Sequence, residues 1–298
     1  MLSVNTLKEV NYSFDTLSVQ GLACGGKETK ENIVLCLHGW LDNSASFLPL
    51  MSYFEKNLEN KRVIAIDWPG HGHSSHRSAD AHYHFIEWIY DLLQLCELNQ
   101  WQQVDIVGHS MGGMVASAFA AAFPEKVKSL TLLDSIGFIT TEAEQATQQL
   151  RDGMLSRFKG SALYRKNNGS KNSRYHTSIN SAIKARVMVS DLEFEQAKLI
   201  VERGLVEETE GYRWRSDPRL RNVSPYRFTS KQAQQFIQDI KCPVKLIYAS
   251  NGIAKQGIKT FGHLFQNFSS VELKGGHHVH MEMPQATTEL IKKFVAEL

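Results

Sequence analysis

The sequence predicts an α/β fold in which helices cover both faces of a mostly parallel sheet and a helical segment is inserted into the core. Up to residue 134, and again from residue 241, short apolar runs rich in β-branched residues alternate with stretches of helical periodicity. This alternation is typical of parallel strands joined by crossover helices. Between about residues 135 and 240 the pattern is helical, polar and basic, with no convincing buried strand. We therefore predict a core of residues 1–134 and 241–298 that encloses a helical cap of residues 135–240.

The elements of the core follow from local patterns. Residues 10–22 alternate weakly between apolar and polar side chains, which favours an opening antiparallel pair of strands. Short apolar runs predict the buried strands Ile33–Leu37, Arg62–Ile66, Val104–Val107, Val127–Leu133, Pro243–Ala249 and Ser270–Leu273. Helical periodicity predicts the helices Ser46–Leu58, Tyr83–Leu98, Met114–Ala122, Lys259–Gln266 and Pro284–Leu298. Within the cap, Asn, Gly and Ser residues cluster over 167–173 and predict a loop.

Composition is that of a soluble globular protein. The chain has 298 residues, of which 42% are hydrophobic and 21% charged, enough for one large core. A net charge of +2 gives no reason to expect a nucleic acid or an anionic membrane as partner. No apolar run approaches the length of a membrane span, and residues 1–9 lack a signal-peptide pattern. The four cysteines form no C-x-x-C pair and three lie in apolar segments, which favours buried, reduced thiols and a cytoplasmic location.

The most informative motif is Gly108-His109-Ser110-Met111-Gly112, between the strand ending at Val107 and an Ala-rich helix. A G-x-S-x-G motif between strand and helix is typical of a nucleophile elbow, a turn so tight that the serine takes strained backbone angles. The flanking glycines lack a Cβ and let strand and helix approach. The Ser110 hydroxyl would then be exposed above a helix N-terminus, which favours developing negative charge. Ser110 is the predicted nucleophile.

Four motifs, in this order, resemble those of the α/β-hydrolase superfamily: His38-Gly39, Asp67-x-Pro69-Gly70-His71-Gly72-x-Ser74, Gly108-x-Ser110-x-Gly112 and Gly276-His277. The resemblance covers the whole predicted core and implies the α/β-hydrolase fold, with an eight-stranded, mostly parallel sheet. Further segments resemble the serine hydrolase-like protein subgroup: Gly39-Trp40-Leu41-Asp42-Asn43, Leu133-Asp134-Ser135, Asp217-Pro218-Arg219-Leu220 and Gly276-His277-His278-Val279-His280. Membership of this subgroup does not specify a substrate.

A serine hydroxyl needs a base that removes its proton as it attacks. In this fold the order along the chain is serine, acid, histidine, so the base is expected late. His277 follows two glycines after the last predicted strand, and Glu282 and Pro284 stand where similar enzymes place H-x-x-x-x-E-x-P. His277 is the predicted base, with His278 as the alternative. A metal site is not predicted here, because beyond Glu282 the loop offers no carboxylate or cysteine at ligand spacing.

The acid that would orient this histidine departs from the family pattern. Most similar enzymes carry it after the seventh strand, which here leads into Ala249-Ser250-Asn251-Gly252, without a carboxylate. Asp134 directly follows the sixth strand at the same edge of the sheet, and some members of the superfamily place their acid there. Asp134 is the predicted acid, which would hold the imidazole tautomer and stabilise the imidazolium. Three alternatives stay open: Asn251 orients the histidine without charge, Asp134 only anchors the entry to the cap, or the triad is weakened.

Backbone N–H groups are expected to form the oxyanion hole, because they require no particular side chain. One belongs to Met111, directly after the nucleophile, and the other to Trp40, which follows the third strand. His38, Asp67 and His71 are interpreted as residues that brace the neighbouring loops by hydrogen bonds.

These observations predict a serine hydrolase without cofactor or metal, acting on an ester or related small acyl substrate. A serine at the elbow argues against haloalkane dehalogenase and epoxide hydrolase chemistry, which the superfamily performs with an aspartate there. One alternative is acyl transfer, or peracid formation of the haloperoxidase-like kind, with an alcohol or a peroxide in place of water. Another is a non-catalytic binding protein on a hydrolase scaffold, which the missing carboxylate after the seventh strand supports. The sequence does not determine the oligomeric state.

Overall fold

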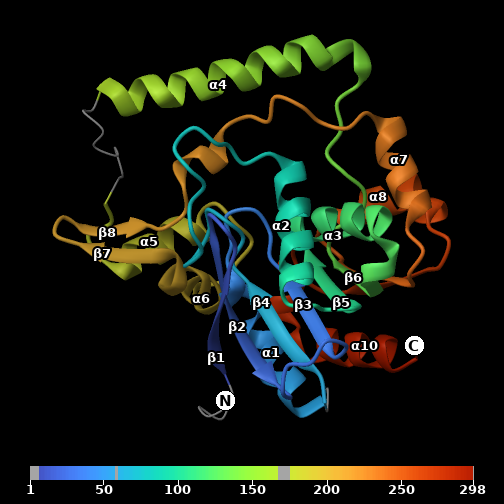
Figure 1. Ribbon diagram of the computed structural model, residues 1–298. Helices are drawn as coiled ribbons and strands as arrows, with labels where there is room; N and C mark the ends of the chain where they lie inside the picture. Colours follow the sequence, from blue (N-terminus) through green and yellow to red (C-terminus); the bar gives the residue numbers. More distant parts are fainter. Residues whose placement is uncertain (1–6, 58–59, 167–174, 298) are drawn as a thin grey trace.

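Eight strands form one sheet in the order β1-β2-β4-β3-β5-β6-β9-β10 in the computed structural model, which describes residues 7–57, 60–166 and 175–297 (Figure 1). The strands are β1 (Lys8–Ser13), β2 (Ser18–Gly25), β3 (Ile33–Leu37), β4 (Arg62–Ile66), β5 (Val104–His109), β6 (Val127–Leu133), β9 (Val244–Ala249) and β10 (Phe268–Leu273). β2 pairs antiparallel with β1 and with β4, and all the other pairs are parallel. The predicted eight-stranded, mostly parallel sheet is confirmed.

Helices cover both faces of this sheet (Figure 1). Those of the core are α1 (Leu48–Asn57), α2 (Phe85–Leu98), α3 (Met111–Ala122), α8 (Ala254–Phe261), α9 (Val279–Glu282) and α10 (Pro284–Ala296). Several boundaries differ from the prediction; α3, for example, begins at Met111 and not at Met114, and β10 begins at Phe268 and not at Ser270. The first helix is preceded by a 3-10 turn, η1 (Ser44–Phe47), and the helix expected at 259–266 begins earlier and ends in the 3-10 turn η5 (Gly262–Leu264).

The hydrophobic core has two layers, one on each face of the sheet, and the side chains of β3 contribute to both. Ile33, Leu35 and Leu37 pack with α2 and α3, whereas Val34 and Cys36 pack with α1 and α10. All five side chains are fully buried. A strand that is apolar on both faces is typical of the centre of a parallel sheet, and its carboxyl end is therefore fixed from both sides.

Between β6 and β9 the chain forms α4 (Ala146–Lys166), α5 (Ile179–Val187), α6 (Phe194–Gly204), a hairpin of β7 (Leu205–Glu208) and β8 (Gly211–Trp214), η4 (Pro218–Arg221) and α7 (Ser230–Asp239). The hairpin was not predicted, because its four-residue strands are mostly half-buried and contain no buried apolar run. α4 lies along the outer edge of the molecule (Figure 1). The predicted loop over 167–173 lies outside the described residues, and the division of the chain into core and cap stays a prediction.

Two arginines fasten this inserted segment to the core. Arg203 of α6 donates from Nε to both carboxylate oxygens of Asp67, at 3.1 and 2.9 Å, and from Nη1 to Glu9 of β1 at 2.7 Å. Arg219 of η4 donates to four backbone carbonyl groups of the loop that precedes α2, and it pairs with Asp217 at 2.7 Å. Each guanidinium therefore joins elements that are far apart in the sequence.

All four cysteine side chains are buried, as predicted. Among the described helices, none combines the length and the apolar character that crossing a membrane requires.

Candidate active site

Ser110 occupies a strained turn between β5 and α3, with φ 51° and ψ −118°. A Cβ on Gly112 would lie 2.1 Å from the carbonyl oxygen of Leu37, and one on Gly108 would lie 2.7 Å from Cα of Gly113. Only glycine fits at both places, since neither backbone neighbour can move aside. The sequence therefore forms the predicted tight turn between strand and helix, called the elbow below, and the half-buried Ser110 stands at the carboxyl end of β5.

His277 reaches this edge of the sheet from the loop between β10 and α9. Its Nδ1 lies 2.7 Å from Oδ2 of Asp134, which directly follows β6 and has a positive φ of 42°. Asp134 is fully buried, whereas the His277 side chain is 24% exposed. Of the two predicted alternatives for the base, His277 is therefore the one whose ring contacts Asp134.

Burial opposes ionisation of Asp134, but hydrogen bonds from His277 and from the backbone N–H groups of Ile253 and Ala249 lower the pKa of its carboxyl group. An ionised Asp134 only accepts hydrogen bonds, so Nδ1 of His277 is the donor. In the neutral form of this ring, Nε2 then carries no proton and can accept one.

The turn that follows β9 surrounds the Asp134 carboxylate with backbone groups. The N–H groups of Ala249, Ile253 and Ala254 donate to its oxygens at 3.2, 2.8 and 3.4 Å. A Cβ on Gly252 would lie 2.2 Å from Oδ1 of Asp134. The turn of residues 249–254, which contains no acidic residue, therefore contacts the carboxylate of Asp134, the residue that follows β6.

The loop after β3 lies against the elbow. A Cβ on Gly39 would come within 3.2 Å of Cβ of Ser110. The predicted oxyanion-hole residues Trp40 and Met111 each directly follow one of these two neighbouring residues. His38 fixes this loop: its Nε2 accepts from the backbone N–H of Trp68 at 3.0 Å, and its Nδ1 lies 2.7 Å from the Gly39 carbonyl. This bracing arrangement is the one that the sequence predicted for His38.

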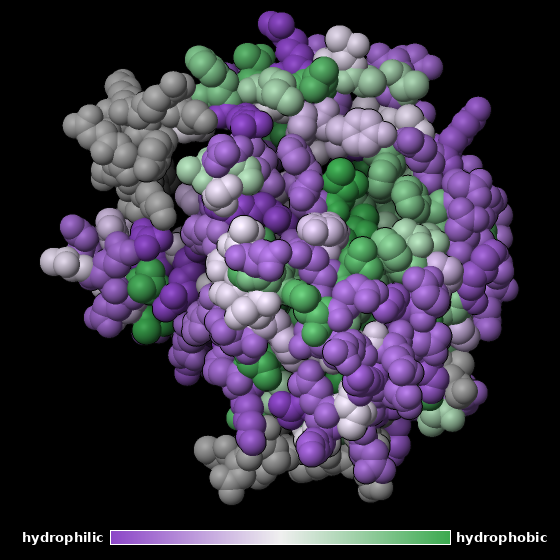
Figure 2. Space-filling model, viewed as in Figure 1, coloured by the Kyte–Doolittle hydropathy of each residue, from purple (hydrophilic) through white to green (hydrophobic). Residues whose placement is uncertain are grey.

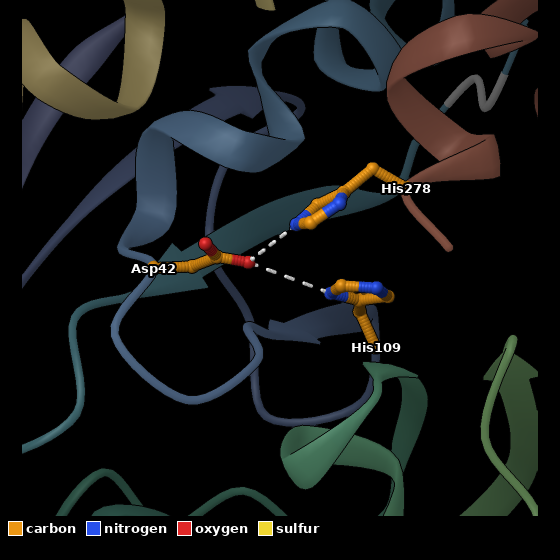
Figure 3. A group of neighbouring side chains, drawn as sticks. All are labelled: Asp42, His109 and His278. Atoms are coloured by element: carbon orange, nitrogen blue, oxygen red, sulfur yellow. Dashed lines mark hydrogen bonds and ion pairs between the residues drawn. The ribbon is translucent and has the colours of Figure 1, made fainter. Parts of the chain in front are cut away.

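Beside the elbow, Asp42, His109 and His278 form a buried group (Figure 3). Oδ2 of Asp42 lies 3.2 Å from Nε2 of His278 and 3.6 Å from Nδ1 of His109. On its other side, the His278 ring places Nδ1 2.6 Å from Oδ1 of Asp191. Burial alone would lower the pKa of His278, but the Asp42 charge and the hydrogen bonds to both carboxylates raise it to about 9. His278 is therefore an imidazolium between two carboxylates at neutral pH.

These residue types also occur as metal ligands, and the three ligand atoms lie within 4.8 Å of one another. A metal ion would need an unprotonated Nε2 on His278. In this structure both ring nitrogens of His278 face carboxylates, and the Arg186 guanidinium already lies 2.5 Å from Oδ1 of Asp42. The charges present fit an ion-pair network better than a metal centre.

The sequence did not point to Asp42 and Asp191 as partners of His278. Asp42 stands inside a quoted motif, Gly39–Asn43, so a signal was available. Asp191 lies in no motif and is separated from His278 by 87 positions, so no local pattern connects the two residues.

Comparisons with known proteins agree with this architecture. A family model described as the α/β hydrolase fold matches residues 32–284. A serine hydrolase-like protein of Danio rerio is 32% identical over 270 residues, which cover 88% of this chain and 81% of the relative. One of Dictyostelium discoideum is 30% identical and covers 97% of this chain and 82% of the relative. The crystal structure of a hypothetical protein from Pseudomonas aeruginosa PAO1 has a TM-score of 0.86 and 32% identity, over 97% of this chain and 99% of the other. The chain belongs to the α/β-hydrolase family and, within it, to the serine hydrolase-like subgroup.

Proposed function

We propose that this protein is a serine hydrolase that cleaves esters or related small acyl compounds with Ser110, His277 and Asp134. The observation that carries the proposal is the 2.7 Å contact between Asp134 Oδ2 and His277 Nδ1, at the edge of the sheet where the strained Ser110 stands. Family membership supports hydrolase activity. The ester class and the roles of the three residues are part of the proposal.

In the proposed reaction, Oγ of Ser110 attacks the carbonyl carbon of the substrate while Nε2 of His277 takes the hydroxyl proton. The tetrahedral intermediate then loses the alcohol, which receives that proton from His277, and an acyl-enzyme remains. Water attacks the acyl-enzyme with the help of His277 and releases the acid and free Ser110. Asp134 stays ionised throughout and stabilises the imidazolium of His277.

The oxyanion of the tetrahedral intermediate would accept hydrogen bonds from the backbone N–H groups of Trp40 and Met111. Two features support this assignment. Met111 is the first residue of α3, and an N–H at that position has no acceptor within the regular hydrogen-bond pattern of a helix. The loop of Trp40 lies against the elbow, since a Cβ on Gly39 would be only 3.2 Å from Cβ of Ser110.

An apolar surface supports an acyl substrate with a hydrocarbon part. Phe138, which follows Asp134 by four residues, packs with Phe85, Phe228 and Phe236 at ring distances of 5.7 to 6.0 Å. All four rings are half-buried. Figure 2 shows apolar side chains gathered between α2 and α7, the helices that carry Phe85 and Phe236. A hydrocarbon chain placed there would lose contact with water, which is favourable.

The proposal is tested with an active-site-directed fluorophosphonate, which bonds covalently to an activated serine. Wild-type protein should be labelled and Ser110→Ala should not, with equal far-UV circular dichroism as the check on folding. A panel of p-nitrophenyl esters of graded acyl length, with Ser110→Ala as the blank, then identifies the preferred acyl group. Absence of labelling in folded wild-type protein would instead favour the non-catalytic binding protein.

A further inference from the structure

In the loop of His277, the three consecutive residues 276–278 each have a backbone group within hydrogen-bond distance of a side chain. The Glu282 carboxylate accepts from the N–H of Gly276 at 2.9 Å, and Nε2 of His109 lies 3.1 Å from the carbonyl oxygen of His277. The N–H of His278 donates to Oδ2 of Asp191 at 3.0 Å. Glu282 belongs to α9, which follows this loop, and His109 to the end of β5, whereas Asp191 comes from the connection between α5 and α6. The inserted segment thus holds the backbone directly beside His277.

The same segment holds the loop after β3. Arg186 of α5 places Nη2 2.5 Å from Oδ1 of Asp42, and Asn43 donates from Nδ2 to the carbonyl of Ile200 in α6 at 2.8 Å. Asp42 and Asn43 lie two and three residues after Trp40. The His278 ring contacts Asp42, in the loop after β3, through Nε2 and contacts Asp191 through Nδ1. Because His278 itself belongs to the loop of His277, it connects the two loops and the inserted segment.

Resting on the proposed function, we propose that Asp191 and Arg186 are positioning residues. Asp191, His278, Asp42 and Arg186 form a chain of contacts between the loop of His277 and the loop of Trp40. Through this chain, Asp191 and Arg186 fix the position of the base His277 relative to the backbone N–H of Trp40. The chain contains two carboxylates and two cations. Asp42 and His278 are buried and Arg186 is half-buried, whereas Asp191 lies at the surface with its side chain 31% exposed. Each charge has an opposite charge beside it, so removal of one member leaves a neighbour without its partner, which is costly at buried positions. Neither Asp191 nor Arg186 is required to touch the substrate.

The fluorophosphonate labelling rate should depend on pH in a specific way, because the network requires a protonated His278. The titratable or charged groups that face His278 or its two carboxylates come from all the elements packed around it: Asp42, Asp191, Arg186, His109, His277, His280 and Glu282. The labelling rate should fall when His278 loses its proton near pH 9, because the network then loses one of its two cations. In Asp191→Asn one negative charge beside His278 is gone, so the alkaline fall should move about one pH unit or more downward.

The experiment compares wild type, Asp191→Asn and Arg186→Gln with the control Arg213→Gln. The control breaks an ion pair between Arg213 and Glu208 within the hairpin of the same inserted segment. The first readout is the fluorophosphonate labelling rate between pH 6 and pH 10. The second is amide hydrogen exchange of segments 274–282 and 39–44, which needs no activity and reports whether the loops have loosened.

We expect Asp191→Asn and Arg186→Gln each to slow labelling about ten- to a hundredfold, because small displacements of a base or a donor have effects of this size. Both variants should exchange faster in the two segments, and Arg213→Gln should stay within about twofold of wild type in rate. Asp191→Asn that labels at the wild-type rate with an unshifted pH profile would overturn this inference alone. Wild type that is not labelled at all would overturn the proposed function and this inference with it. Stoichiometric zinc retained by wild type and lost in Asp42→Asn would show a metal centre in place of the network.

Discussion

Asp134 and His277 are 143 positions apart in the chain, yet their side chains meet at 2.7 Å. Asp134 directly follows β6, the strand beside β5, and His277 follows β10, so both stand at the carboxyl edge of the sheet with Ser110. In doubly covered parallel sheets this edge is where functional residues gather. The contact also assigns roles to the two nitrogens of the ring, since Nδ1 is engaged and Nε2 remains available.

Asp134→Asn should lower kcat about a thousandfold or more and leave KM nearly unchanged. The amide would donate a hydrogen bond to Nδ1 and so favour the wrong imidazole tautomer, and it would remove the charge that stabilises the imidazolium. Steady-state hydrolysis of the best p-nitrophenyl ester measures this. Asn251→Ala is the matched control and should reduce kcat less than about twofold. The reverse pattern would make Asn251 the residue that orients His277.

The stabilising effect of His278 should decline at alkaline pH. Folding raises its pKa from the unfolded value near 6.5 to about 9. The protonated ring therefore stabilises the fold fully below about pH 6.5, and this stabilisation is lost as the pH rises through 9. The difference in Tm between wild type and His278→Gln, measured by scanning calorimetry, should be larger at pH 6 than at pH 9.5. A difference that is equal at the two values would mean that His278 is not the buried cation inferred from its two carboxylates.

Arg203→Met should destabilise the protein by about 3–5 kcal/mol at pH 7, because it leaves Asp67 buried without a cation. Burial opposes ionisation of Asp67, while Arg203 lowers the pKa of its carboxyl group in the wild type. In the variant this carboxyl should take up a proton as the pH falls toward 4, so the destabilisation should shrink. Urea unfolding at pH 7 and pH 4 provides both values. Glu9→Gln, which removes the largely exposed partner of the same arginine, should cost less than about 1 kcal/mol.

Two glycine-to-alanine substitutions should have opposite effects. In Gly112→Ala the new Cβ would lie 2.1 Å from the Leu37 carbonyl oxygen, so the elbow must distort, at a cost of about 2 kcal/mol or more. In Gly160→Ala, within α4, the new Cβ would lie 3.5 Å from Oδ1 of Asn222, an ordinary van der Waals contact. That change should stabilise the protein by about 0.5–1 kcal/mol, because alanine favours the helix. Thermal unfolding of the two variants is the measurement, and equal shifts would contradict the assigned geometry of the elbow.

The sequence predicted the sheet and the elbow well because their signals are local. Buried strands such as Ile33–Leu37 are continuous apolar runs, and the glycines around Ser110 are required by contacts within the same turn. The place of Asp134 was also predictable, since the end of β6 must adjoin the end of β5 in a parallel sheet. The contacts of Asp42 with His278 were not, because 236 positions separate them and only the folded sheet brings them together.

The turn from Ala249 to Ala254 holds the Asp134 carboxylate through main-chain N–H groups. Main-chain donors are supplied by every amino acid except proline, so little side-chain identity is demanded of this stretch. Randomised codons at the exposed positions Asn251 and Ile253 should yield mostly active clones, while Gly252 should tolerate almost no replacement, since any Cβ would collide with the carboxylate. Selection on this turn would therefore conserve its backbone conformation and Gly252, and would leave the other side chains free to vary.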